Sequence, residues 1–100
     1  MTRTIEEYRA QLKAMLPELA DKFGVAELGL FGSRVRGDHR DDSDLDVLVT
    51  FRPDARVSLF TLGGLATMLE EDLEVGVDLA IKDNLEPRLR PYILREELRI

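Results

Sequence analysis

LGLFGSRVRGDHRDDSDLDVLVTF, residues 28–51, places two short apolar runs on either side of a strongly charged segment. The first run, 28–31, ends at Gly32 and Ser33. Ten residues later, Asp44-Leu45-Asp46 opens a nearly continuous apolar run over 45–51. Short apolar runs bounded by glycine and polar residues predict β-strands, and the second should be buried on most of both faces.

The residues before this stretch predict an amphipathic helix. Thr4 and Glu7 form a capping box, and Gly24 stands where a helix commonly ends. Pro17 should kink or restart the helix, since proline lacks the amide that the helical ladder uses. The apolar positions recur at helical spacing: Ile5, Tyr8, Leu12, Met15 and Leu19.

The residues after this stretch predict another helix, another strand and a last helix. Ser58 caps a helix over 59–73, Gly76 precedes a strand over 77–81, and Asn84 and Pro87 begin the last helix. Its inward residues should be Leu89, Tyr92, Ile93 and Leu98. The expected fold is α/β (α+β), a single domain over 1–100 in which helices pack on one side of a small mixed β-sheet.

Composition limits the classes of function. The chain is 44% hydrophobic and 34% charged, which is typical of a globular domain. A net charge of −6 without a basic cluster argues against direct nucleic-acid binding. The absence of cysteine excludes disulfides and thiolate metal ligands. No apolar run suits a membrane span or a signal peptide, so we expect a cytoplasmic protein.

The Gly-Ser turn is a candidate phosphate site. Gly32 lets the backbone approach a phosphate closely, and Ser33 adds a hydroxyl. Ser33 is also expected to cap the helical turn that follows. The free backbone amides at the start of that turn can donate to the same phosphate. Arg34 and Arg36 can pair with phosphate oxygens through their guanidinium groups. The alternative for both arginines is an ordinary surface position or an ion pair with the acidic loop that follows.

The carboxylates are a candidate metal site. Asp44 and Asp46 are two residues apart, so on a strand they share a face. Two such charges ~4 Å apart repel by about 4 kcal/mol at an effective dielectric of 20, and a divalent cation relieves that cost. Asp78, in an otherwise apolar strand, completes a triad if the two strands are neighbours. The alternative for Asp78 is a charge that protects a sheet edge.

The whole pattern resembles the nucleotidyltransferase superfamily related to DNA polymerase beta. That pattern is Gly-Ser, ten residues, Asp-x-Asp and a third acidic residue on a later strand, as in Gly32-Ser33, Asp44-Leu45-Asp46 and Asp78. The extended form FGSRVRG…SDLDVLV most resembles the minimal nucleotidyltransferases (MNT proteins), small prokaryotic domains often encoded beside a HEPN ribonuclease toxin. The resemblance covers nearly the whole chain.

The resemblance implies a reaction. Asp44, Asp46 and Asp78 would be catalytic and would bind two Mg²⁺ ions, while Gly32 and Ser33, with Arg36, would hold the phosphates of ATP. A hydroxyl would attack the α-phosphate, and pyrophosphate would leave. In MNT antitoxins that hydroxyl belongs to a tyrosine of the HEPN toxin, which is silenced by the attached AMP.

Two other functions remain open at this point. One is a binding-only antitoxin, catalytically silent, that blocks the toxin sterically. The complete set of acidic residues argues against it. The other is transfer to a small molecule such as an aminoglycoside, but relatives of that kind usually carry an acceptor-binding domain. Tyr8 and Tyr92 lie on apolar helix faces and are expected in the core rather than as acceptors.

Overall fold

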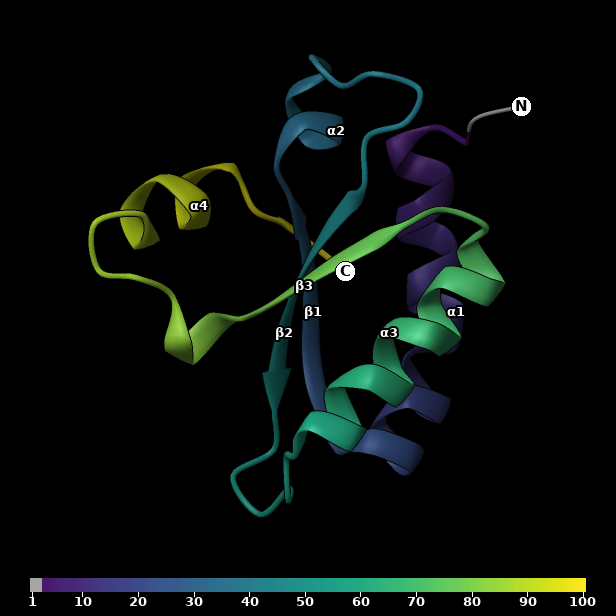
Figure 1. Cartoon of the computed structure of the whole chain (residues 1–100), viewed down its shortest axis with the longest axis vertical. Helices are drawn as coiled ribbons and strands as arrows, with labels where there is room; N and C mark the ends of the chain where they lie inside the picture. Colours follow the sequence, from purple (N-terminus) through teal and green to yellow (C-terminus); the bar gives the residue numbers. More distant parts are fainter. Residues whose placement is uncertain (1–2) are drawn as a thin grey trace.

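The computed structural model describes residues 3–100, so the first two residues of the predicted domain lie outside the described part. Within this described range, nine elements follow one another (Figure 1). They are α1 (Ile5–Phe23), β1 (Val25–Phe31), α2 (Ser33–Arg36), β2 (Leu45–Phe51), α3 (Leu59–Leu73), β3 (Val77–Ile81), the 3-10 helix η1 (Lys82–Asn84), α4 (Arg90–Glu96) and β4 (Leu98–Arg99). Among residues 3–100, no helix is both long and apolar enough to cross a membrane.

The four strands form one mixed sheet in the order β3-β2-β1-β4. β1 is antiparallel to both β2 and β4, whereas β2 and β3 are parallel. A parallel pair needs a crossover connection, and α3 supplies it. The predicted bounds of β2, α3 and β3 are confirmed, while β1 starts at Val25 rather than at residue 28.

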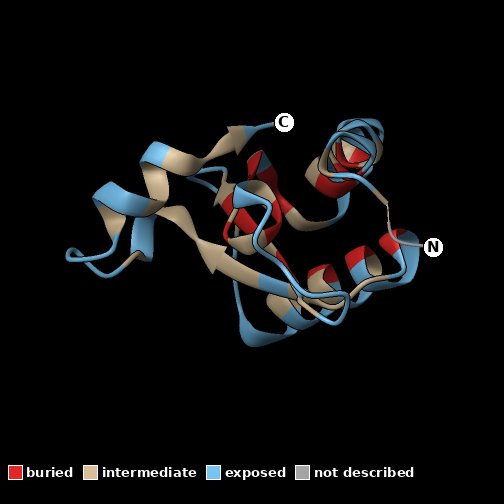
Figure 2. Cartoon of the chain, turned by 90° about the horizontal axis from the view of Figure 1, so that it is seen from above, coloured by how far each residue is buried: buried red, intermediate tan, exposed pale blue. Residues whose placement is uncertain are grey.

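Two helices cover one face of the sheet. In Figure 1, α1 and α3 lie side by side on the same side of the strands, and α4 lies on the other side. Buried residues face inward from both helices and from the strands (Figure 2). The buried core comprises Tyr8, Leu12, Met15, Leu19, Val25, Leu28, Leu30, Leu45, Val47, Val49, Leu65, Leu69 and Leu73. The predicted α+β class, with helices on one side of a mixed sheet, is confirmed.

Helix α1 runs through Pro17 without restarting. The capping box of Thr4 and Glu7 begins it, and Gly24 ends it in the left-handed conformation with φ of 75°. Proline in a helix interior costs about 3 kcal/mol. Leu12 and Leu19, on either side of the proline, are both fully buried in the same core. Burial of that continuous apolar face therefore outweighs the local cost of the proline.

The last predicted helix is wrong in extent and in orientation. Helix α4 is short, and Leu98 belongs to β4, which pairs with β1 through Leu30. Leu89 and Tyr92 are exposed instead of inward, at 52% and 66% exposure, so Tyr92 is not a core residue. Pairing with β1 satisfies the backbone of the C-terminal residues, which a local apolar pattern cannot reveal. Tyr8 is buried as predicted.

Candidate active site

The start of β2 brings the predicted site residues together. On one side, Asp46 pairs with Phe31, the last residue of β1 before the Gly32 turn. On the other side, Asp46 pairs with Asp78 on β3. Leu45 and Val47 point into the core beneath α1 and α3, so Asp46 between them faces the other side of the sheet. The carboxylate of Asp46 therefore lies between the Gly-Ser turn and the third predicted acidic residue.

Gly32 has a backbone conformation that only glycine adopts readily. Its φ is 85° and its ψ is −161°. A Cβ at this position would also collide with the carboxylate of Asp46. Gly32 stands at the cap position of α2, whereas Ser33 is the first helical residue, so the prediction that Ser33 caps this turn is wrong. The glycine is thus required by the backbone and by its contact with Asp46.

Asp46 carries an unfavourable charge. Partial burial raises the pKa of its carboxyl, and the charges of Asp78 and Asp44 raise it further. The guanidinium of Arg36 opposes this shift, but only in part. The carboxylates of Asp78 and Asp44 thus lie close enough to repel that of Asp46. A cation at this place would relieve that repulsion, and carboxylate oxygens are ligands that Mg²⁺ accepts.

Asp44 is exposed just before β2 and contacts the residue that precedes β3. A Cβ on Gly76 would collide with its carboxylate, and the amide of Leu45 donates a hydrogen bond of 2.8 Å to the Gly76 carbonyl. The absence of a side chain at Gly76 therefore leaves room for Asp44 beside β3.

The position of Asp78 is compatible with both interpretations given by the sequence. β3 is an edge strand and Asp78 is exposed, so water solvates its charge and the cost expected of a buried carboxylate does not arise. Its register next to Asp46 is the placement that a shared metal requires. Within residues 3–100, no three carboxylate or histidine side chains are already arranged around a single metal position.

Arg34 is a structural residue and not a phosphate ligand. Only 5% of it is exposed, and its guanidinium donates hydrogen bonds to the carbonyls of Ser43, at 2.7 and 3.0 Å, and Asp41. The same group lies over the Tyr8 ring, 5.8 Å from its centre. Arg34 thereby fixes the end of the loop that leads into Asp44.

We expect Arg34→Ala to lower the free energy of unfolding by about 2–3 kcal/mol, because charged hydrogen bonds from a buried guanidinium to the Ser43 and Asp41 carbonyls are lost. Urea unfolding followed by circular dichroism measures this change. Arg40→Ala is the matched control, since Arg40 is exposed in the same loop and its loss should change stability by less than about 0.5 kcal/mol. Equal effects of the two substitutions would contradict the anchoring role of Arg34.

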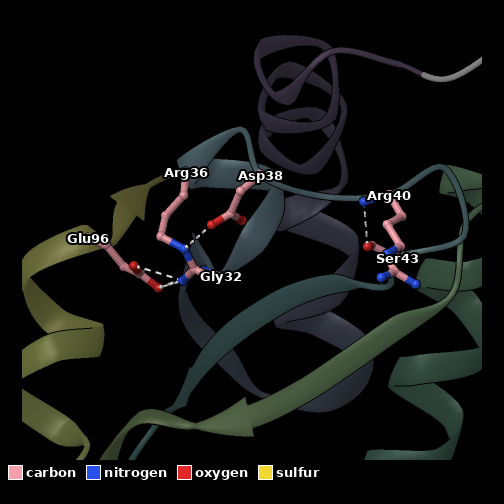
Figure 3. Close-up of polar contacts among 6 residues, drawn as sticks. All are labelled: Gly32, Arg36, Asp38, Arg40, Ser43 and Glu96. Carbon is pink, nitrogen blue, oxygen red and sulfur yellow. Dashed lines mark hydrogen bonds and ion pairs between the residues drawn. The ribbon is translucent and has the colours of Figure 1, made fainter.

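Arg36 is exposed and lies between two carboxylates (Figure 3). It pairs with Asp38 at 3.1 Å and with both carboxylate oxygens of Glu96 at 3.1 Å. Hydrogen bonds to Asp38 and then to Glu96 raise the pKa of Arg36. The ion pair with the acidic loop was the alternative given by the sequence, and the contact with Glu96 was not expected. Arg36 nevertheless borders the Gly32 turn, where a phosphate would lie.

Two residues at the site had escaped the sequence-based prediction of its function. Gly76 was expected only as the start of a strand, and Glu96 only as part of a terminal helix. The Glu96 side chain also accepts a hydrogen bond of 2.8 Å from the Gly32 amide, 64 positions away along the chain. No local pattern marks such a contact, because it depends on how the C-terminal segment folds back onto the sheet.

Comparison with known proteins places this chain in a family. A family model described as nucleotidyltransferase domain matches residues 12–100. The protein adenylyltransferase MntA of Thermococcus cleftensis is 42% identical over 93 residues, covering 93% of this chain and 92% of that protein. A solved structure of a candidate minimal nucleotidyltransferase, 38% identical, superposes with a TM-score of 0.78 and covers 98% of this chain and 97% of its own.

A more distant structure shares the fold alone. It is a chain of the complex between the tri-AMPylated HEPN toxin of Shewanella oneidensis and its MNT antitoxin, 18% identical, with a TM-score of 0.65. The match covers 92% of this chain and 70% of that chain. Because the family model spans most of the sequence and a relative of 42% identity covers nearly all of it, this chain belongs to the nucleotidyltransferase family, as its resemblance to minimal nucleotidyltransferases predicted.

Proposed function

We propose that this chain transfers AMP from ATP to a tyrosine hydroxyl of a HEPN ribonuclease toxin and thereby acts as its antitoxin. The main support is the register that sets Asp46 beside Asp78 next to the Gly32 turn, in a chain 42% identical to a protein adenylyltransferase. The AMPylated HEPN toxin found with a structurally similar MNT antitoxin supports the class of acceptor.

Three carboxylates are the proposed ligands of Mg²⁺, and two ions are expected. Burial, and then the charges of Asp78 and Asp44, raise the pKa of Asp46, so a bound cation would offset the cost of its charge. Asp44 and Asp78 are exposed, and rotation of their side chains can bring their oxygens toward a metal held by Asp46. When bound, Mg²⁺ supplies charge neutralisation for the triphosphate and polarises the attacking and leaving oxygens.

The remaining roles fall to groups at the turn and on β3. The Gly32 turn, with the Ser33 hydroxyl and the Arg36 guanidinium, would hold the β- and γ-phosphates. Asp78 would accept the proton of the tyrosine hydroxyl while the tyrosine oxygen forms a bond to the α-phosphorus. The bond between the α-phosphorus and the bridging oxygen breaks, and pyrophosphate departs with that oxygen.

The test is label transfer to a purified HEPN ribonuclease toxin. With Mg²⁺ and ATP labelled at the α-phosphate, we expect the purified HEPN protein to become labelled, whereas ATP labelled at the γ-phosphate should leave it unlabelled. Mass spectrometry should find the added AMP on tyrosine. An unlabelled HEPN protein in the presence of correctly folded enzyme would refute the proposed transfer.

A binding-only antitoxin is the second candidate, and one surface favours it. Leu59 and Phe60, at the start of α3, are 85% and 93% exposed. Leu59 lines an apolar groove of about 620 Å³ together with Leu62, Leu79 and Ile81. Neutralisation of the toxin in cells by Asp44→Asn/Asp46→Asn at native expression would select this candidate over AMP transfer.

A further inference from the structure

We propose that Glu96 is a built-in competitor of the triphosphate and so sets the affinity of this protein for nucleotide. Its carboxylate accepts hydrogen bonds from the Gly32 amide and the Arg36 guanidinium, and a bound triphosphate displaces this carboxylate from both donors. The inference rests on the proposed function, because that function assigns these two donors to phosphate.

The Glu96 carboxylate is within hydrogen-bonding distance of both donors, the Gly32 amide and the Arg36 guanidinium. One oxygen accepts from the Gly32 amide at 2.8 Å and from Arg36 at 3.1 Å, while the other accepts from the same Arg36 nitrogen at 3.1 Å. Figure 3 shows the Arg36 guanidinium between Glu96 and Asp38, next to Gly32. The Glu96 side chain is only 25% exposed, so water does not compete freely for these donors.

A carboxylate and a phosphate bind the same kinds of hydrogen-bond donor. Both present negatively charged oxygens that accept from backbone amides and pair bidentately with guanidinium groups. While Glu96 holds the Gly32 amide and one side of Arg36, those donors are not available to a phosphate. Arg36 keeps Asp38 as its second partner, so it stays at the turn when Glu96 leaves.

The fold holds Glu96 next to the turn. Its neighbour Glu97 pairs with Lys82 at 2.9 Å, and both side chains are largely buried, at 8% and 15% exposure. A Cβ on Gly29 would collide with the Glu97 carboxylate, so the C-terminal segment lies directly on β1. β4 then pairs with the same strand. Rotation of the Glu96 side chain alone can therefore release the donors, without unfolding of the segment.

Calorimetric titration with magnesium tripolyphosphate tests the inference, since this probe has phosphates but no base or ribose. At constant ionic strength we expect Glu96→Gln and Glu96→Ala to bind it about two- to fivefold more tightly than the wild type, the range that removal of a partly exposed ion pair allows. Glu71→Gln is the matched control, because it removes the same charge from an exposed position on α3. Thermal melting of each variant checks that it is folded.

Tighter binding by both Glu96 variants, with Glu71→Gln unchanged, supports the inference. Unchanged or weaker binding by folded Glu96 variants overturns it, and weaker binding would make Glu96 a residue that orients Arg36. AMP transfer by the wild type is measured in parallel. If the wild type transfers AMP but the Glu96 variants do not bind more tightly, this inference alone fails. If no variant binds tripolyphosphate and no AMP is transferred, the proposed function fails with it.

Discussion

Asp46→Asn should lower the rate of AMP transfer by at least roughly 100-fold, because one preorganised charged group at the reacting phosphate is typically worth a factor of 10²–10³. The substitution keeps the shape of the side chain but removes the charge that is proposed to bind the cation. Initial rates of label transfer to the HEPN protein, measured at saturating ATP and Mg²⁺, give this ratio directly.

The same substitution should raise the free energy of unfolding at pH 7. Burial and the charges of Asp78 and Asp44 raise the pKa of Asp46 in the folded protein, so its ionisation opposes folding. The carboxyl group favours the folded state while it is protonated, below the unfolded pKa of about 3.9, and this advantage is lost as the pH rises through the higher folded pKa. The gain from Asp46→Asn should therefore vanish near pH 3.

Asp54→Asn is the matched control for both effects. Asp54 is exposed in the loop after β2, at the opposite end of the strand from the carboxylates. Its substitution removes one charge without touching the site, so rate and stability should stay near the wild-type values. An Asp46→Asn protein that retains normal transfer, or that is less stable than wild type at pH 7, would contradict the role assigned to Asp46.

Gly32→Ala should lower the free energy of unfolding by about 2–4 kcal/mol and reduce AMP transfer by roughly 100-fold. The φ of 85° with ψ of −161° costs about 1–3 kcal/mol for a residue with a Cβ. The added methyl group would also collide with the Asp46 carboxylate, and overpacking of that kind costs about 1–3 kcal/mol. Displacement of a reacting group by about 1 Å is enough for a 100-fold loss of rate.

Gly37→Ala separates the two causes. Gly37 has the same φ of 85°, but nothing lies within 4 Å of the position of its Cβ. Its substitution should cost only the backbone strain, about 1–2 kcal/mol, and should leave transfer intact. Urea unfolding and label transfer measure both variants. Equal losses of activity in Gly32→Ala and Gly37→Ala would show that contact with Asp46 does not matter.

Much of the fold could be predicted because its signals are local. The bounds of β2 follow from a continuous apolar run, and Ser58 fixes the start of α3 through its side-chain hydrogen bond to the Thr61 amide. The C-terminal helix was predicted wrongly because β4 forms only where β1 offers a free edge. An apolar pattern alone does not show whether the backbone of a segment forms hydrogen bonds within a helix or with a distant strand.

Some features of the candidate site could likewise be predicted from the sequence, and others could not. The spacing of Gly32, Asp44 and Asp46 is visible in the sequence, since each lies within a few residues of a strand. The position of Asp78 depended on which strand β3 would join, and the parallel register with β2 places it beside Asp46. The sequence leaves Arg34 open between a phosphate contact and a surface position or ion pair. Its burial could not be predicted, because it depends on contact with Tyr8 in a different element.

The amino-acid order alone determined the strands β1, β2 and β3, the two long helices, the glycine-serine turn and the paired carboxylates, because propensity, capping and apolar spacing act over a few residues. Tertiary structure decided which charges meet. It set Asp78 beside Asp46, buried Arg34, and brought Glu96 onto the Gly32 amide from 64 positions away. Such contacts depend on sheet register and on burial shared among distant segments, and no local stretch of the chain specifies either.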